Sequence, residues 1–320
     1  TTIPTSTPDE TMPAIIEYFK GKMNAENPDD NIKALCVACF GPVDVRPNSK
    51  TYGNILYTPK IAWRNFPILS TLREGLDNIP TGFDTDVNGS LLGEATWGTA
   101  KGLTDAVYFT IGTGIGMGAM SGGNLIHGML HPEAGHIMML PVPGDEYAGH
   151  CPSHGACFEG MACGPALEGR WKKPARELAN DDKVWDLEAK YVAQALTSVI
   201  YMLSPQKIIL GGGVASQVQI FPLVRKYVLE YINGYLDGVR ANAHIAYING
   251  QNSYASLVWH TTDAVPEPGR ELVVIGKKGI KIYPNPANGK MSWEFFVRIS
   301  RMERWMYAED ILPDSQENNK

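Results

Sequence analysis

The chain has 320 residues, of which 44% are hydrophobic and 19% are charged, and its net charge is −6. This length and apolar content predict a globular protein large enough for two domains. The negative charge argues against nucleic acid as a partner, because there is no basic surplus to neutralise phosphates. No apolar run reaches the length of a membrane span, and the N-terminal TTIPTSTPDE has no signal-peptide pattern. We therefore expect a cytoplasmic protein without a membrane partner.

The first elements predict an open α/β sheet. Asp9 and Glu10 precede MPAIIEYFKGKM, and acidic residues favour the positive end of a helix dipole, so one amphipathic helix is expected there. The apolar run IKALCVACF ends at Gly41-Pro42, which predicts a buried strand followed by a turn that could present a ligand loop. A second helix is expected over residues 67–76.

Two cysteines lie in that apolar run. Cys36 and Cys39 are three positions apart, so their side chains point to opposite faces of a strand. We interpret both as core residues rather than as a second metal site.

Asp86 falls where the short strand IPTGFD runs into a predicted helix. An Asp at such a junction can cap the first helical turn, and that role alone would explain it. The alternative is a general base, because a phosphoryl-transfer enzyme needs a carboxylate that accepts the proton of the attacking hydroxyl. The residues alone leave both interpretations open.

Two glycine-rich turns follow predicted strands. DAVYFTIGTGIGMGAM predicts a strand, a tight turn and a second strand, and the turn contains Thr110, Gly112, Thr113 and Gly114. A phosphate chain could approach the backbone N–H groups there without meeting Cβ atoms. The second turn, residues 211–213 (Gly211, Gly212 and Gly213), ends the buried strand of PQKIILGGGVA and could lie flat against adenine or ribose. Glycine turns without a ligand are the alternative for both.

Helical periodicity is present around the second turn. WKKPARELAN and KVWDLEAKYVAQALTSVIYML precede it, and FPLVRKYVLEYINGYL follows it. Apolar positions three and four apart predict helices that pack on a core.

Residues 131–171 hold three of the five cysteines, in a spacing that suits one metal ion. Cys151, His154 and Cys157 are three residues apart, and His136 lies one loop upstream. Thiolates and imidazoles are the ligands that structural Zn²⁺ prefers, and four protein ligands make a closed, non-catalytic site. His150 could replace His136, and Cys163 is a spare ligand. A glycine-rich surface loop with incidental Cys and His is the alternative.

The same stretch carries two acids that zinc does not need. Glu133 precedes His136 by three residues and Glu159 follows Cys157 by two, so a loop folded around a metal would bring both acids close to it, where they would suit sugar hydroxyls. E-x-G-H followed by C-x-x-H-x-x-C-x-E-x-x-x-x-G-P-A-x-E-x-R-W resembles the ROK sugar kinases, most closely their fructokinase branch. The resemblance covers about residues 1–238.

The resemblance implies a two-domain α/β fold of the ribonuclease-H-like, actin/hexokinase type, with domains 1–104 and 105–240. It implies a homodimer that phosphorylates the 6-hydroxyl of D-fructose, with Mg²⁺ on the ATP and structural Zn²⁺. Asp86 lies in a T-D-x-N signature and would be the base. The hexose ligands would be Glu133, His136, Glu159 and Asn88. The two glycine turns would bind ATP.

The resemblance fails at both ends. The D-x-G-G-T phosphate turn of the family is not found ahead of the first predicted helix, so we expect an incomplete N-terminal domain and weak ATP turnover. The alternative function is a truncated or fused, catalytically weak relative that still binds sugar and zinc. In residues 241–320, the segments ELVVIG, IKIYP, SWEFFVRI and ERWMYA alternate apolar and polar residues, which predicts an appended antiparallel β module.

Overall fold

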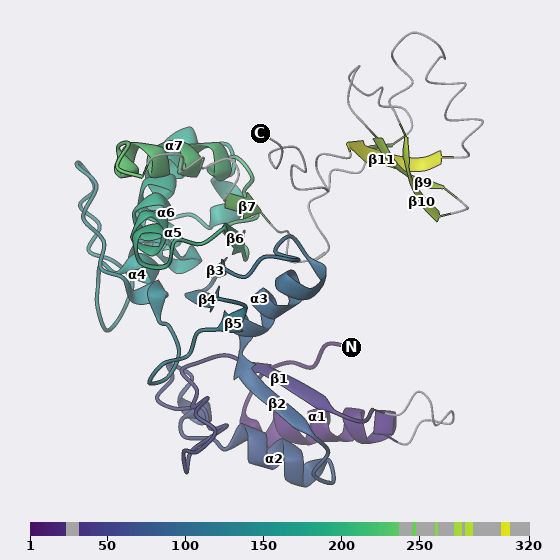
Figure 1. Cartoon of the computed structure of the whole chain (residues 1–320). Coiled ribbons are helices and arrows are strands. Elements are labelled where there is room, and N and C mark those ends of the chain that lie inside the picture. Colours follow the sequence, from purple (N-terminus) through teal and green to yellow (C-terminus); the bar gives the residue numbers. More distant parts are fainter. Residues whose placement is uncertain are drawn as a thin grey trace. The chain divides into compact units, whose positions relative to one another are not determined.

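The computed structural model describes residues 1–23 and 32–236, together with five strands between residues 245 and 307. The chain divides into two compact units, Thr1–Ser253 and Tyr254–Lys320, and each is described by itself. Figure 1 shows the elements of both units.

The first sheet has two parallel strands, β1 (Leu35–Cys39) and β2 (Thr81–Thr85), in the register Cys39↔Thr85. Helices α1 (Pro8–Met23) and α2 (Ile68–Gly75) run along these strands (Figure 1), and Met12, Cys39 and Leu72 share one buried core. These elements confirm the predicted helix–strand–helix order. Cys39 is buried as expected, but Cys36 is exposed, so its interpretation as a core residue is wrong.

The second sheet has five strands in the order β5-β4-β3-β6-β7. The strands β3 (Ala106–Ile111), β4 (Ile115–Ser121) and β5 (Asn124–Leu125) form an antiparallel meander. β6 (Lys207–Gly211) pairs with β3 in parallel, and β7 (Ile245–Tyr247) pairs with β6 in parallel. Parallel neighbours end at the same sheet edge, so the turns after β3 and β6 lie together.

Helices fill the core against this sheet. The longest are α6 (Asp182–Leu203) and α7 (Ile220–Ile232), and apolar side chains of both join those of β3 and β6 in one buried cluster. Two short helices, α4 (Phe158–Ala162) and α5 (Gly164–Trp171), precede them, and α3 (Asp86–Trp97) follows β2 directly. The remaining elements are the 3₁₀ turns η2 (Ile61–Trp63), η3 (Ala134–His136) and η4 (Ala175–Glu177).

The predicted helix in WKKPARELAN is wrong except for one 3₁₀ turn at η4. Helix α5 ends at Trp171 because Lys172 adopts the left-handed conformation, at φ 59°. Pro174 then disfavours helical geometry at the residue before it.

The second unit contains a four-stranded antiparallel sheet in the order β10-β9-β11-β8. Its strands are β8 (His260–Thr261), β9 (Leu272–Gly276), β10 (Gly279–Tyr283) and β11 (Met302–Tyr307). They confirm the strands predicted in ELVVIG, IKIYP and ERWMYA, whereas SWEFFVRI lies outside the described residues.

The two compact units divide after Ser253, and the predicted appended module of residues 241–320 stays a prediction. Strand β7 extends the second sheet of the first unit by pairing with β6, and the second unit begins at Tyr254. The division between domains 1–104 and 105–240 stays a prediction. Among the described residues, no helix combines the length and the apolarity needed to cross a bilayer.

Candidate active site and metal cluster

Asp86 is the first residue of α3, directly after β2. The N-cap is Thr85, whose Oγ1 accepts a hydrogen bond of 3.1 Å from the backbone N–H of Asn88. The Asp86 carboxylate accepts from the next N–H, that of Val87, at 2.9 Å. The N-cap of the helix is therefore Thr85, and Asp86 follows it in the first turn.

The ammonium group of Lys60 and the ring of His131 interact electrostatically with the Asp86 carboxylate. Burial raises the pKa of Asp86, and Lys60 and His131 act in the opposite direction. The ammonium group of Lys60 lies 3.6 Å from the centre of the Phe40 ring, a cation–π contact. Phe40 follows Cys39 and Asp86 follows Thr85, and those two residues are register partners in the sheet. The strand pairing therefore brings the Lys60 ammonium to Asp86.

Asp84 organises the end of β2. One of its carboxylate oxygens accepts from the Asn88 side chain at 2.8 Å, and the other contacts Nε2 of His127 at 2.8 Å. Asn88 is buried, with 1% of its surface exposed. In this structure the Asn88 carboxamide therefore supports Asp84, and its predicted contact with a sugar stays a prediction.

His131 and Glu133 follow β5 along the chain. The His131 ring accepts a hydrogen bond from the backbone N–H of Val43 at 3.1 Å, and its other nitrogen lies 3.4 Å from a Glu133 oxygen. Desolvation, together with the weaker effects of the neighbouring carboxylates of Glu159 and Asp86, raises the pKa of Glu133 to about 7. The three acids predicted from the sequence therefore share one electrostatic environment.

Glu159 is held against the first glycine turn. Its Oε2 accepts a hydrogen bond of 2.9 Å from the backbone N–H of Ile115, and a Cβ added to Gly114 would lie 2.8 Å from that oxygen. A Cβ added to Gly135 would lie 2.0 Å from the carbonyl oxygen of Ile115, so the glycine lets η3 approach β4 closely.

The two glycine turns adjoin, as the parallel pairing of β3 and β6 requires. A Cβ on Gly112 would lie 3.7 Å from the backbone nitrogen of Gly213, and Gly112 also accepts from the N–H of Gly164 at 2.7 Å. Gly212 has φ 91°, and its added Cβ would lie 2.5 Å from the Ile111 carbonyl oxygen, so only glycine fits. Nothing lies within 4 Å of a Cβ added to Gly213. The turn is open where a planar group could approach.

Four metal-ligand side chains converge in the loop after η3. The ligand atoms of His136, Cys151, His154 and Cys157 all lie within 4.8 Å of one another. Nδ1 of His136 is 3.5 Å from the Cys157 sulfur and 3.9 Å from the Cys151 sulfur, and Nδ1 of His154 is 3.6 Å from the Cys151 sulfur. A tetrahedral zinc with bonds of about 2.0–2.3 Å separates its ligands by about 3.3–3.8 Å. These residues therefore fit Zn²⁺, and the set contains His136 rather than His150 or Cys163.

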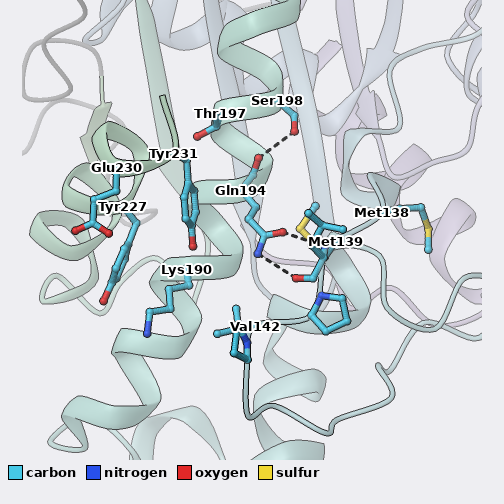
Figure 2. Close-up of a pocket in the computed structure, with 13 residues that line it drawn as sticks. Met138, Met139, Val142, Lys190, Gln194, Thr197, Ser198, Tyr227, Glu230 and Tyr231 are labelled. Atoms are coloured by element: carbon cyan, nitrogen blue, oxygen red, sulfur yellow. Dashed lines mark hydrogen bonds between the residues drawn. The ribbon is translucent and has the colours of Figure 1, made fainter. Parts of the chain in front are cut away.

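A groove of about 700 Å³ lies elsewhere, between residues 138–143 and the helices α6 and α7. Figure 2 shows the Gln194 side chain of α6 reaching the loop, where its amide pairs with both backbone groups of Leu140 at 3.0 Å. Tyr227 and Tyr231 stack on α7, with ring centres 6.2 Å apart. The predicted catalytic and ligand residues do not line this groove.

The sequence matched Lys60 to the family resemblance without giving it a role, and it did not single out three further residues near the acids: Asp84, His127 and His131. Asp84 could have been named from the sequence, since it lies two residues before Asp86 at the end of the same predicted strand. Lys60 and the two histidines reach the site only through tertiary packing.

Together, two α/β sheets, adjoining glycine turns and a nearby group of acids define the actin/hexokinase-like class of kinases. The chain belongs to the ROK family, whose pattern matches residues 1–255. This confirms the predicted fold class and family.

Individual relatives agree with this assignment. A protein of Bacillus subtilis (strain 168) is 49% identical over 234 residues, which are 73% of this chain and 75% of the relative. The fructokinase of Pediococcus pentosaceus is 41% identical over 233 residues, 73% of this chain and 78% of its own length. The crystal structure of the ROK hexokinase from Thermus thermophilus superposes with a TM-score of 0.62 at 26% identity, covering 77% of this chain and 83% of that one.

Proposed function

We propose that the chain is an ATP-dependent fructokinase that phosphorylates the 6-hydroxyl of D-fructose. The observation that carries this proposal is the state of Asp86. Its carboxylate lies at a helix start that Thr85 already caps, desolvation raises its pKa, and it interacts electrostatically with Lys60 and Glu133. The named fructokinase among the relatives supports fructose as the hexose.

In the proposed reaction, the Asp86 carboxylate accepts the proton of the 6-hydroxyl while the hydroxyl oxygen attacks the γ-phosphorus of ATP. The new O6–P bond forms as the bond between the γ-phosphorus and the bridging oxygen breaks, and ADP leaves. Mg²⁺ bound to the nucleotide neutralises phosphate charge in such reactions. The protein contributes position and the base.

We assign sugar binding to the acids and histidine around Asp86. Glu133 and Glu159 can accept hydrogen bonds from sugar hydroxyls, and His136 can donate one from Nε2 while its Nδ1 binds a metal. Asn88 is included in this proposal as predicted from the sequence. The shared electrostatic environment of Asp86, Glu133 and Glu159 supports a common ligand.

We assign ATP binding to the two glycine turns. Thr110, Gly112, Thr113 and Gly114 would contact the phosphates, and residues 211–213 would contact adenosine. Their position side by side at one sheet edge supports this assignment, since ligands of open α/β sheets bind outside the carboxyl ends of strands.

We assign one structural Zn²⁺ to His136, Cys151, His154 and Cys157. Four protein ligands leave no open position for a catalytic water, so such an ion would fix the loop that carries Glu133 and Glu159. The close approach of the four ligand atoms supports this role.

A coupled assay of ADP release with fructose, glucose and mannose tests the function. We expect the highest kcat/KM with fructose and little ADP release without sugar. A higher kcat/KM with glucose would show that glucose, not fructose, is the preferred substrate. ADP release that is independent of any hexose would contradict the proposal that the chain is a sugar kinase.

We also propose that the chain is a homodimer whose contact face includes the groove of Figure 2. Exposed apolar side chains at this groove support the proposal, with Met138 63%, Leu140 77% and Tyr231 37% exposed. Sedimentation should show a dimer that Leu140→Glu weakens. The matched control is Leu92→Glu on α3, where Leu92 is 52% exposed and lies away from the groove. A monomeric wild-type chain would contradict the proposal.

A further inference from the structure

His131 connects two segments that the proposed sugar site needs. Its side chain is 5% exposed, and its two ring nitrogens face different partners. Nε2 lies 3.1 Å from the backbone nitrogen of Val43, in the turn after β1. Nδ1 lies 3.4 Å from Oε1 of Glu133.

The contact with Val43 fixes which nitrogen carries the proton. A backbone N–H can only donate, so Nε2 of His131 must offer its lone pair. Burial lowers the pKa of His131, which favours the neutral ring. A neutral imidazole whose Nε2 accepts carries its proton on Nδ1, the nitrogen that lies 3.4 Å from Glu133, and the ring also interacts with the backbone of Pro132.

The ring is also held in place by the backbone around Gly41. A Cβ added to Gly41 would lie 3.2 Å from Cε1 of His131, so the glycine lets the turn come close to the ring. The distance of 3.4 Å from Nδ1 to Glu133 is long for a hydrogen bond, and contacts of this kind often tighten when a substrate binds.

We propose that His131 is a positioning residue for sugar recognition, which holds the 41–43 turn with Nε2 and orients the Glu133 carboxylate with Nδ1–H. This inference rests on the proposed function, in which Glu133 binds the hexose. With one oxygen of Glu133 directed to His131, the other is available to accept from a sugar hydroxyl. His131 is not one of the four side chains of the metal cluster, and the family resemblance gives it no role.

Two amide variants separate the two contacts. In His131→Gln, the amide oxygen can replace Nε2 as the acceptor for Val43, but the donor to Glu133 is lost. In His131→Asn, the shorter amide can replace Nδ1–H as the donor to Glu133, but the acceptor for Val43 is lost. We expect His131→Gln to raise the KM for fructose roughly ten-fold or more, with a smaller change in kcat, because a hydrogen bond to a charged group is lost.

The order of the two variants in KM and in melting temperature is the decisive result. His131→Asn should raise KM less than His131→Gln and lower the melting temperature more. If His131 had only a structural role, the rise in KM would parallel the fall in melting temperature in both variants. That result would overturn the proposal. In a Glu133→Gln background, His131→Gln should add little further change in KM, because the partner is already altered.

A measurement without turnover separates this proposal from the proposed function. Long-range ¹H–¹⁵N NMR correlations of the histidine rings in the wild-type chain should show His131 neutral and protonated on Nδ1. Protonation on Nε2 would overturn the positioning role even if the chain phosphorylates fructose. A wild-type chain with the expected tautomer but no hexose phosphorylation would instead overturn the proposed function.

Discussion

Two acids of the acid cluster, Glu133 and Glu159, flank the metal cluster in the sequence, but the two clusters are built differently. The metal cluster takes its four ligands from residues 136–157, within one loop. The acid cluster, Asp86, Glu133 and Glu159, is assembled from the start of α3, the segment after β5 and the start of α4. Only the acid cluster therefore depends on how distant segments pack.

The two clusters also differ in the chemistry of their side chains. The four metal ligands approach one another at distances that a single cation would satisfy. In the acid cluster, desolvation and, less strongly, the like charges of Glu159 and Asp86 raise the pKa of Glu133 to about 7. In the proposed function, the first arrangement would be a structural site and the acid cluster would be a reactive site.

Loss of the metal cluster should have the largest effect. Cys157→Ala removes one ligand, and we expect the zinc content to fall from one per chain to near zero, with rapid proteolysis in residues 136–157. The reason is that the binding free energy of a structural zinc, roughly 10–16 kcal/mol in small zinc domains, becomes folding free energy. Elemental analysis and limited proteolysis measure both.

Cys163→Ala is the matched control, because Cys163 is equally buried but lies outside the ligand set. It should keep one zinc per chain. Equal zinc loss in both variants would show that the effect is general destabilisation.

Asp86→Asn should break the reactive site and leave the metal cluster intact. The amide keeps the shape of the side chain but cannot accept the proton, so we expect kcat to fall by roughly 10²–10⁴-fold, with a small change in the sugar KM. The zinc content should stay at one per chain. Retention of most of the wild-type kcat would mean that another group is the base.

Lys60→Met should change the pH dependence of the reactive site by a smaller amount. Lys60 lowers the pKa of Asp86 against the effect of burial, so its removal should raise that pKa. The base must be deprotonated to act, and activity is therefore lost as the pH falls through its pKa. We expect the acid limb of the kcat profile to move to higher pH.

Lys101→Met is the control for charge, since Lys101 is exposed and follows α3. Its profile should match the wild type. A shift to lower pH in Lys60→Met would contradict the assigned role.

Asn88→Ala should have the smallest effect, and it tests the predicted sugar contact of this residue. If Asn88 only supports Asp84, loss of its hydrogen bond should lower the melting temperature and reduce kcat/KM about five-fold, which corresponds to about 1 kcal/mol. A rise in the fructose KM at unchanged melting temperature would instead support direct binding.

The sequence predicted the local features well. The Cys/His spacing and the glycine turns are encoded by neighbouring residues, so the four converging side chains and both turns could be named in advance, whereas their roles stay predictions. The fourth metal ligand could not be decided, because His136 and His150 have equivalent chemistry and only the folded loop brings His136 to the sulfurs.

The features that the sequence did not predict depend on tertiary packing. Lys60 reaches Asp86 by lying over Phe40, and His131 reaches Val43 across 88 positions of sequence. Asp86 could not be separated from a helix cap, because Thr85 and Asp86 are both good capping residues and only the observed hydrogen bond decides between them.

The Ile115 peptide joins the first glycine turn to the acid cluster. Its N–H donates to Glu159, Gly135 lies against its carbonyl oxygen, and Gly114 directly precedes it. If the proposed assignments hold, a phosphate that shifts this turn would also shift Glu159, the proposed sugar ligand, so the two substrates should be thermodynamically coupled. Linkage requires the coupling to be reciprocal, and calorimetry should find that the sugar changes the affinity for a non-hydrolysable ATP analogue by the same factor as the analogue changes the affinity for the sugar.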